Sequence, residues 1–243
     1  MLVAGDGEAG VPDRAPFDRI IATCAVPAVP AEWVRQLRSG GRLVADIRAA
    51  TSSALITAQR KETGELVGRF HAVPGHFMWL RPRADVPLPR HGGEGDMTFD
   101  RTALRNTDLG LDPAVLDDPE FGFQLALRVP GIVQSLRRPD RGTRILRTSD
   151  GSWSEIDGSG SASQSGPRSV GDEIADAYRA WTALDQPRRS DYGLTVTSDG
   201  TTTIWRGSAD EPRIGTSPCT GLPVVSVGRT VTTEDVHALD DDC

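Results

Sequence analysis

Two short groups of residues near the amino terminus could do chemistry, and each lies at the end of an apolar stretch. The first is the Gly5-Asp6-Gly7 turn, which ends the stretch that begins at Leu2. The second ends another apolar stretch and consists of Thr23, Cys24 and Ala25. In open α/β sheets, ligands bind beyond the carboxyl ends of the strands, so both groups occupy positions typical of a ligand site. The Asp6 carboxylate could accept hydrogen bonds there from an adenine amine or a ribose hydroxyl.

Each group also has a simpler interpretation. An Asp-Gly pair after a strand is common in ordinary turns. Cys24 carries a small, weakly polar side chain, and burial as a small residue is a more common role than that of a nucleophile. The residues alone leave these alternatives open.

Neither a metal site nor a catalytic triad is predicted. His71 and His76 have no cysteine or carboxylate motif around them, and the three cysteines lie far apart at positions 24, 219 and 243. The chain lacks a Gly-x-Ser-x-Gly elbow. Its glycine cluster at 92–95 follows no predicted strand and opens no predicted helix, which favours a linker over a phosphate-binding loop.

The composition excludes several classes of function. A formal net charge of −7 argues against a nucleic-acid-binding surface, which needs clustered cations. No apolar run approaches the roughly 18 residues of a membrane span, and no basic segment precedes an apolar run as in a signal peptide. We therefore predict no membrane partner and a cytoplasmic location.

The elements that must position the candidate residues form an alternating pattern. Strands are predicted at Leu2–Gly5, Arg19–Ala25 and Arg42–Ile47, with a short helix at Ala31–Leu37 that ends before Gly40 and Gly41. Strands that alternate with a helix over short connections predict parallel pairing. A charged turn then separates two strands expected to pair antiparallel, and another strand follows; their ranges are Ala54–Gln59, Leu66–Phe70 and His76–Arg81.

A second region is predicted beyond a boundary rich in Pro, Arg and Gly at Pro82–Gly95. Helices are expected at Pro119–Leu127 and Val170–Leu184, the latter from its helical apolar spacing. Two hairpins are expected, with strands at Arg144–Thr148, Ser152–Ile156, Tyr192–Thr197 and Thr201–Trp205. The Ser/Gly-rich residues Gly158–Gly166 predict a flexible loop, and the polar tail 207–243 predicts disorder.

The amino-terminal pattern resembles a known family. The segments GDG, APFDRIIATCAVP and GGRLV occur in this order over residues 2–47, more loosely to Arg81. They are similar to the carboxyl-terminal half of the catalytic domain of protein-L-isoaspartate O-methyltransferases, which use S-adenosylmethionine. The resemblance implies a truncated Rossmann-like α/β domain at residues 1–82, with a parallel sheet and antiparallel end strands. It also implies that the family's glycine-rich cofactor loop would precede the first residue of this chain.

The same resemblance implies roles for the candidate residues. Asp6 and Gly7 would line the adenine end of the S-adenosylmethionine site, and Thr23, Cys24 and Ala25 would line the substrate pocket. A substrate carboxylate would attack the methyl group in line, so that no general base is required of the protein.

The second region, a small α+β accessory region at 96–206, carries a further resemblance. Its segments DGSWSEI, SGPRSVGDEIADAYRAWTALDQP and DYGLTVTSDGTTTIW are similar to the extension of methyltransferases that accompany ATP-grasp ligases in peptide maturation. This implies a ribosomally made peptide as substrate and recognition of that peptide by the extension. The alternative is a plain accessory domain that packs Tyr178, Trp181, Tyr192 and Trp205 as core. For the whole chain, the expected function is carboxyl O-methylation of aspartyl or isoaspartyl residues; the alternative is an inactive truncated fragment or a non-catalytic peptide-binding protein.

Overall fold

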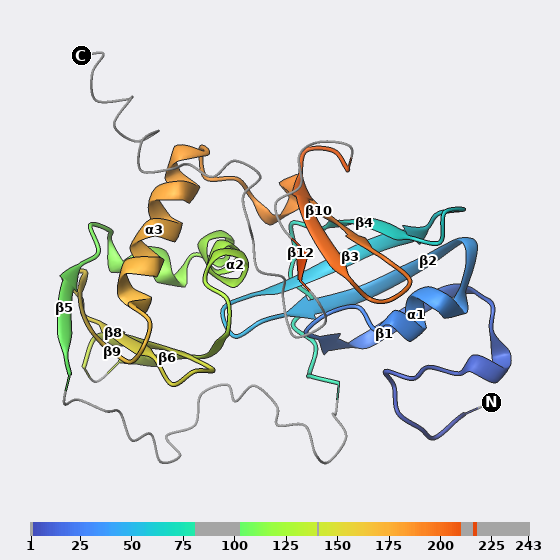
Figure 1. The fold of residues 1–243 in the computed structure, drawn as a ribbon, viewed down its shortest axis with the longest axis horizontal. Helices are drawn as coiled ribbons and strands as arrows, with labels where there is room; N and C mark the ends of the chain where they lie inside the picture. The colour runs from blue at the N-terminus through green and yellow to red at the C-terminus, as the bar shows by residue number, and fades with distance from the viewer. Residues whose placement is uncertain (1, 81–102, 140, 210–215, 218–243) are drawn as a thin grey trace.

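The computed structural model describes residues 2–80, 103–139, 141–209 and 216–217, and within them the chain forms two β-sheets (Figure 1). The first sheet has seven strands in the order β1-β2-β3-β4-β10-β11-β12, and the second has five in the order β5-β9-β8-β7-β6. The strands of the first sheet are β1 (Phe17–Val26), β2 (Leu37–Arg48), β3 (Ser53–Arg60), β4 (Leu66–Phe70), β10 (Tyr192–Val196), β11 (Thr202–Arg206) and β12 (Thr216–Ser217).

The first sheet begins with one pair of parallel strands. Strand β1 runs parallel to β2, with Ile21 opposite Val44 and Ala25 opposite Asp46. The short helix α1 (Ala31–Gln36) connects the two strands and buries Trp33. The remaining neighbours in this sheet pair antiparallel. The predicted α/β class with a mixed sheet is confirmed.

The second sheet is antiparallel throughout and lies beside two helices, as Figure 1 shows. Its strands are β5 (Arg105–Asp108), β6 (Ile132–Arg138), β7 (Thr143–Thr148), β8 (Trp153–Ile156) and β9 (Ser161–Ser165). The helices are α2 (Pro119–Arg128) and α3 (Val170–Ala183), and three short 3₁₀ turns lie at Pro12–Arg14, Pro113–Asp117 and Arg189–Asp191. Asp118 caps α2 by accepting hydrogen bonds from the amides of Glu120 and Phe121.

Helix α2 joins the two hydrophobic cores. Its Phe123 and Leu127 pack in the core of the first sheet, whereas Phe121 and Leu125 pack in the core of the second sheet with α3. A helix that is apolar on several faces must be buried. Its one fully buried polar side chain, Gln124, donates a hydrogen bond from Nε2 to the Tyr192 hydroxyl at 3.2 Å.

Three predicted elements differ in the structure. Leu2–Gly5 is not a strand: these residues form no ladder with a described strand and are exposed, because an apolar stretch becomes a strand only where a neighbour pairs with its backbone. In place of a strand at His76–Arg81, the described residues form a single parallel bridge between Trp79 and Ala25. The expected loop Gly158–Gly166 contains β9, which pairs with β5 and β8.

The organisation of the second region also differs from the prediction. The hairpin β10–β11 belongs to the first sheet, because β10 pairs with β4. Residues 216–217 of the expected disordered tail pair with β11. The predicted boundary at Pro82–Gly95, with its glycine cluster, lies outside the described residues, as does most of the tail. The predicted division of the chain into domains at residues 82–96 and 206–207 stays a prediction.

Candidate functional site

The Gly-Asp-Gly turn is anchored on helix α1. Asp6 Oδ1 accepts a hydrogen bond from the Glu8 amide at 3.0 Å, as in an ordinary Asx turn. The Gly7 carbonyl accepts a hydrogen bond from Trp33 Nε1 at 2.8 Å. A Cβ placed on Gly7 would lie 2.8 Å from Leu80 Cδ1, so a larger residue would displace Leu80. The turn therefore has a defined conformation.

The predicted substrate residues lie at the carboxyl end of β1, next to Leu80. The Leu80 amide donates to the Ala25 carbonyl at 2.8 Å, and the Ala25 amide donates to the Met78 carbonyl at 2.8 Å. Ala25 is fully buried, whereas the Thr23 side chain is exposed. Leu80 thus contacts the predicted cofactor turn with its side chain and the predicted substrate strand with its backbone.

Cys24 packs at the margin of the first core. Partial burial raises the pKa of its thiol above the ordinary value, because the thiolate is desolvated there. A raised pKa lowers the fraction of thiolate, which is the nucleophilic form. The structure therefore favours the packing role for Cys24 over a nucleophilic one.

The predicted cofactor-binding residues Asp6 and Gly7 lie on a partly exposed turn. Asp6 supplies an acceptor, but its Oδ1 is engaged by the Glu8 amide. Neither of the two cavities described next is lined by Asp6, Gly7, Thr23, Cys24 or Ala25. These residues by themselves do not enclose a ligand of that size. Whether they contribute to a cofactor site remains a prediction.

The first cavity, of about 400 Å³, lies at the carboxyl end of β2. It is bounded by the β2–β3 turn, by residues 72–76, by the first residues of α2 and by Arg189; its lining is Arg48, Ala49, Ala50, Thr51, Ser52, Ser53, Ala72, Pro74, His76, Pro119, Glu120 and Arg189. Sequence reasoning missed this site. Its charged residues come from three distant segments, and no spacing motif joins them.

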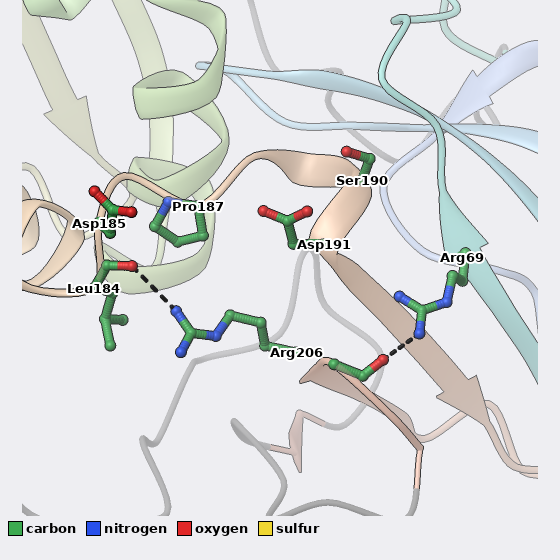
Figure 2. Close-up of a pocket in the computed structure, with 8 residues that line it drawn as sticks. Arg69, Leu184, Asp185, Pro187, Ser190, Asp191 and Arg206 are labelled. Atoms are coloured by element: carbon green, nitrogen blue, oxygen red, sulfur yellow. Dashed lines mark hydrogen bonds between the residues drawn. The ribbon is translucent and has the colours of Figure 1, made fainter.

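The second cavity, of about 590 Å³, lies between the end of α3 and the β10–β11 hairpin and is lined by charges of both signs (Figure 2). Arg206 Nη1 donates to the Leu184 carbonyl at 3.5 Å, and Arg69 donates to the Gly207 carbonyl and stacks on Trp205. Asp185 and Asp191 line the same cavity. Because both acidic and basic side chains line it, its chemistry favours no single class of ligand.

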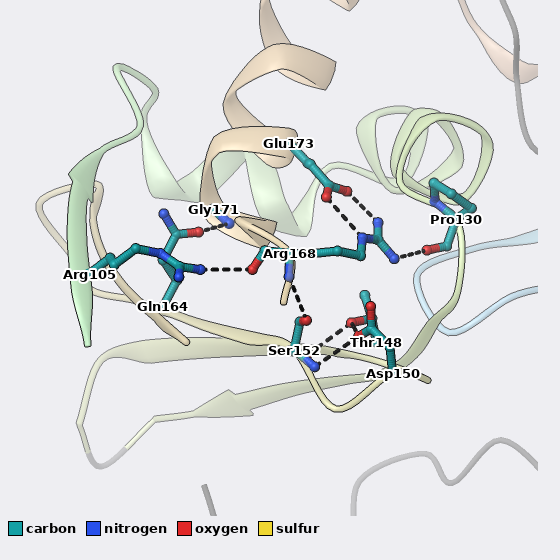
Figure 3. Close-up of polar contacts among 9 residues, drawn as sticks. All are labelled: Arg105, Pro130, Thr148, Asp150, Ser152, Gln164, Arg168, Gly171 and Glu173. Atoms are coloured by element: carbon teal, nitrogen blue, oxygen red, sulfur yellow. Dashed lines mark hydrogen bonds and ion pairs between the residues drawn. The ribbon is translucent and has the colours of Figure 1, made fainter. Parts of the chain in front are cut away.

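A polar network around Arg168 has a structural role. Its guanidinium is paired with Glu173 and donates to the Pro130 carbonyl, as Figure 3 shows; the latter distance is 2.7 Å. Its backbone amide donates to Ser152 Oγ, and Gln164 Oε1 accepts from the Gly171 amide at 2.7 Å. These bonds hold the start of α3 against β8 and β9, so the network stabilises the second region.

Two further classes of site are not found in the described part. No group of three or more His, Cys, Asp and Glu residues there is arranged to hold a metal ion. No helix among the described residues is long and apolar enough to cross a membrane.

The comparisons with known proteins each cover part of this chain. The family model for protein-L-isoaspartate(D-aspartate) O-methyltransferase matches residues 1–74. A protein-L-isoaspartate O-methyltransferase of Hyperthermus butylicus is 32% identical over 93 residues, which are 36% of this chain and 39% of that protein. One from Staphylothermus marinus is 41% identical over 79 residues, or 32% of this chain and 35% of that protein.

A third relative is the most similar of these over a shorter stretch. The protein-L-isoaspartate O-methyltransferase of Chromobacterium violaceum is 63% identical over 43 residues, 18% of this chain and 19% of that protein. A solved protein-L-isoaspartate O-methyltransferase structure covers 85% of this chain and 59% of its own at 20% identity, but its TM-score of 0.40 carries no argument. The chain spans less than two fifths of the length of these curated relatives. Residues 1–74 are therefore similar to one segment of the protein-L-isoaspartate O-methyltransferase family.

Proposed function

We propose that this protein takes part in S-adenosylmethionine-dependent methylation of the carboxyl groups of aspartyl or isoaspartyl residues in a peptide or protein. The proposal is supported by the match of residues 1–74 to the family model, which includes the Gly-Asp-Gly turn and the strand β1. One structural observation carries it further. Leu80 links that turn to the carboxyl end of β1, so that the two predicted groups of residues lie side by side.

In this reaction the protein mainly has to position the substrate carboxylate and the methyl donor. A substrate carboxylate is already ionised at neutral pH, since its ordinary pKa lies near 4, and it needs no general base. The contribution of the described residues is to hold one side of the site. Trp33 fixes the Gly7 carbonyl, and the Leu80 side chain packs at Gly7, while Gly7 itself stays exposed to solvent.

The finer assignments extend this proposal. The resemblance of the accessory region to the extension of peptide-maturation methyltransferases supports a ribosomally made peptide as substrate and an ATP-grasp ligase as partner in the pathway. A cytoplasmic location would follow from such a role. The alternative function is peptide binding without catalysis.

Isothermal titration of the whole chain with S-adenosylmethionine tests the proposal. We expect heat with low-micromolar affinity, and we expect Asp6→Asn to weaken binding about tenfold, the loss expected for a hydrogen bond to a charged group. Asp13→Asn is the matched control, because Asp13 is an exposed carboxylate in the same amino-terminal segment, and it should leave the affinity unchanged.

Two outcomes would decide against the proposal. The absence of heat would show that the chain alone does not bind the cofactor, and would favour the inactive fragment or the peptide-binding protein. Binding without transfer of a radiolabelled methyl group to either an aspartyl or an isoaspartyl peptide would remove the catalytic assignment.

A further inference from the structure

The 400 Å³ cavity lies at the sheet edge where ligands of open α/β sheets bind. Arg48, the last residue of strand β2, lines this cavity. Because β1 runs parallel to β2 and Ala25 lies opposite Asp46, the carboxyl end of β1 reaches the same edge. The cavity therefore lies beside the strand end that the family resemblance assigns to substrate binding.

A buried arginine lies in the wall of the cavity. Arg189 is only 2% exposed, and its amide and Nε both donate to the Glu120 carboxylate, at 2.6 and 3.0 Å. Its Nη1 donates to the Ser53 carbonyl at 2.7 Å. Nη2 makes no hydrogen bond within the described part of the chain. Arg189 lines the cavity, and Nη2 is not one of its buried atoms, so this nitrogen provides a donor that a ligand in the cavity can use.

A second arginine brings positive charge that no carboxylate neutralises in the described part. Arg48 Nη1 donates to the Phe77 carbonyl at 2.7 Å, and the guanidinium stacks on the Trp79 ring at 5.4 Å. These contacts orient the guanidinium but leave its charge unpaired. The Ser52 hydroxyl is buried, has no hydrogen-bond partner among the described residues, and lines the same cavity.

The acidic groups at this end of the sheet are already engaged. Glu120 is paired with Arg189. Asp46 is fully buried behind the wall, where it accepts hydrogen bonds from Ser53 Oγ at 2.8 Å and from the Phe77 amide at 3.1 Å. A Cβ on Gly75 would lie 2.6 Å from the Asp46 carboxyl carbon, so the chain is closely packed there. The charge that remains is the positive charge of Arg48.

We propose that this cavity binds a side-chain carboxylate of a peptide. A planar guanidinium matches a carboxylate in a bidentate manner, and both Arg48 and Arg189 have donors left for one. The volume exceeds that of a bare inorganic anion and falls within the range of about 300–1,000 Å³ for ligand pockets. Small apolar residues complete the lining, namely Ala49, Ala50, Ala72, Pro74 and Pro119, and they suit the aliphatic part of a peptide. The inference rests on the proposed function, which calls for an acidic peptide.

The test is calorimetric titration of the whole chain, without S-adenosylmethionine, using two peptides with blocked termini. The peptides differ only in a central aspartate or asparagine. We expect the aspartyl peptide to bind at least tenfold more tightly. Arg48→Gln should remove most of this preference, and Arg48→Lys should retain part of it, because a lysine keeps the charge and loses the bidentate geometry. Arg179→Gln, at an exposed arginine on α3, is the matched control and should bind as the unmodified protein does.

Three results would overturn the proposal. They are equal binding of the two peptides, an unchanged preference in a folded Arg48→Gln variant, and displacement of the aspartyl peptide by inorganic phosphate at equal concentration. Displacement by phosphate would show that the cavity is a general anion site. Because the cofactor is left out, Arg48-dependent peptide binding would stand even if S-adenosylmethionine does not bind. Conversely, methyl transfer that Arg48→Gln leaves unchanged would refute only this inference.

Discussion

Asp150 organises the turn between β7 and β8 through its carboxylate. Its Oδ1 accepts hydrogen bonds from Thr148 Oγ1 at 2.6 Å and from the Ser152 amide at 2.9 Å, while Gly151 adopts a positive φ of 88°. The β10–β11 turn repeats the Thr-Ser-Asp-Gly sequence and the same bonds, made there by Thr197, Asp199 and Thr201. The hydrogen bond from the Thr148 hydroxyl is the largest cause of the lowered pKa of Asp150.

The lowered pKa predicts an acid-dependent contribution to stability. A carboxyl group whose pKa is lower in the folded state stabilises the fold above its unfolded-state pKa of about 3.9, and this contribution is lost as the pH falls through the lowered value. Asp150→Asn should therefore lower the melting temperature at pH 7, and the difference from the unmodified protein should shrink below about pH 4. Melting curves measured by circular dichroism check this, with Glu62→Gln in another exposed turn as control. A difference that does not depend on pH would contradict it.

Helix α2 approaches the β2–β3 turn closely enough that only glycine fits at position 122. The Thr51 hydroxyl donates to the Gly122 carbonyl at 2.9 Å, and a Cβ on Gly122 would lie 2.4 Å from the Thr51 carbonyl oxygen. The neighbouring atom belongs to the backbone, so it cannot move aside as a flexible side chain would. This contact holds the α2 start against one wall of the cavity.

Gly122→Ala should destabilise the protein although alanine is the better helix former. The intrinsic preference for alanine over glycine is about 1 kcal/mol, whereas overpacking of a tight contact costs about 1–3 kcal/mol. We expect a net loss in the free energy of unfolding, measured as a lower urea midpoint. The Thr51→Ser variant keeps the hydroxyl and should stay close to the unmodified protein. A stabilised Gly122→Ala variant would show that α2 and the turn are not in close contact.

At the scale of the whole molecule, α2 makes the two sheets depend on each other. Phe123 contacts Phe70 and Tyr192 of the first sheet with ring centroids 5.1 and 5.5 Å apart. Phe121 contacts Tyr178 and Trp181 of α3 at 5.7 and 5.3 Å. Neither sheet can keep its core if α2 leaves, which predicts one cooperative unit.

We therefore expect a single calorimetric unfolding transition for the described region. Phe121→Ala should cost about 3–5 kcal/mol by opening a cavity in the second core, and hydrogen exchange should show that amides of the first sheet lose protection to the same extent. Phe123→Ala should give the reciprocal result. Two separate transitions, or a loss of protection confined to one sheet, would contradict this.

The sequence by itself determined the elements that depend on near neighbours. The β1–α1–β2 unit, the three hairpins and both long helices follow from local apolar periodicity and from turn residues, and all appear in the structure. Tyr178 and Trp181 pack in the second core, but Tyr192 packs in the first core and Trp205 lies on β11 of the first sheet. The four rings therefore do not form the one accessory core of the accessory-domain alternative. The family similarity of residues 1–74 is also carried by a contiguous stretch.

Only the tertiary structure decided what depends on distant pairing. Leu2–Gly5 has the apolar character of a strand but lacks a described partner, and β9 has the composition of a loop but pairs on both sides. The β10–β11 hairpin joins β4 rather than a separate region. The cavity joins Ser53 and Arg189, which are 136 residues apart in the chain. Strand pairing and pockets bring together groups that are far apart in the sequence. Local sequence patterns do not specify which of these distant groups will be in contact.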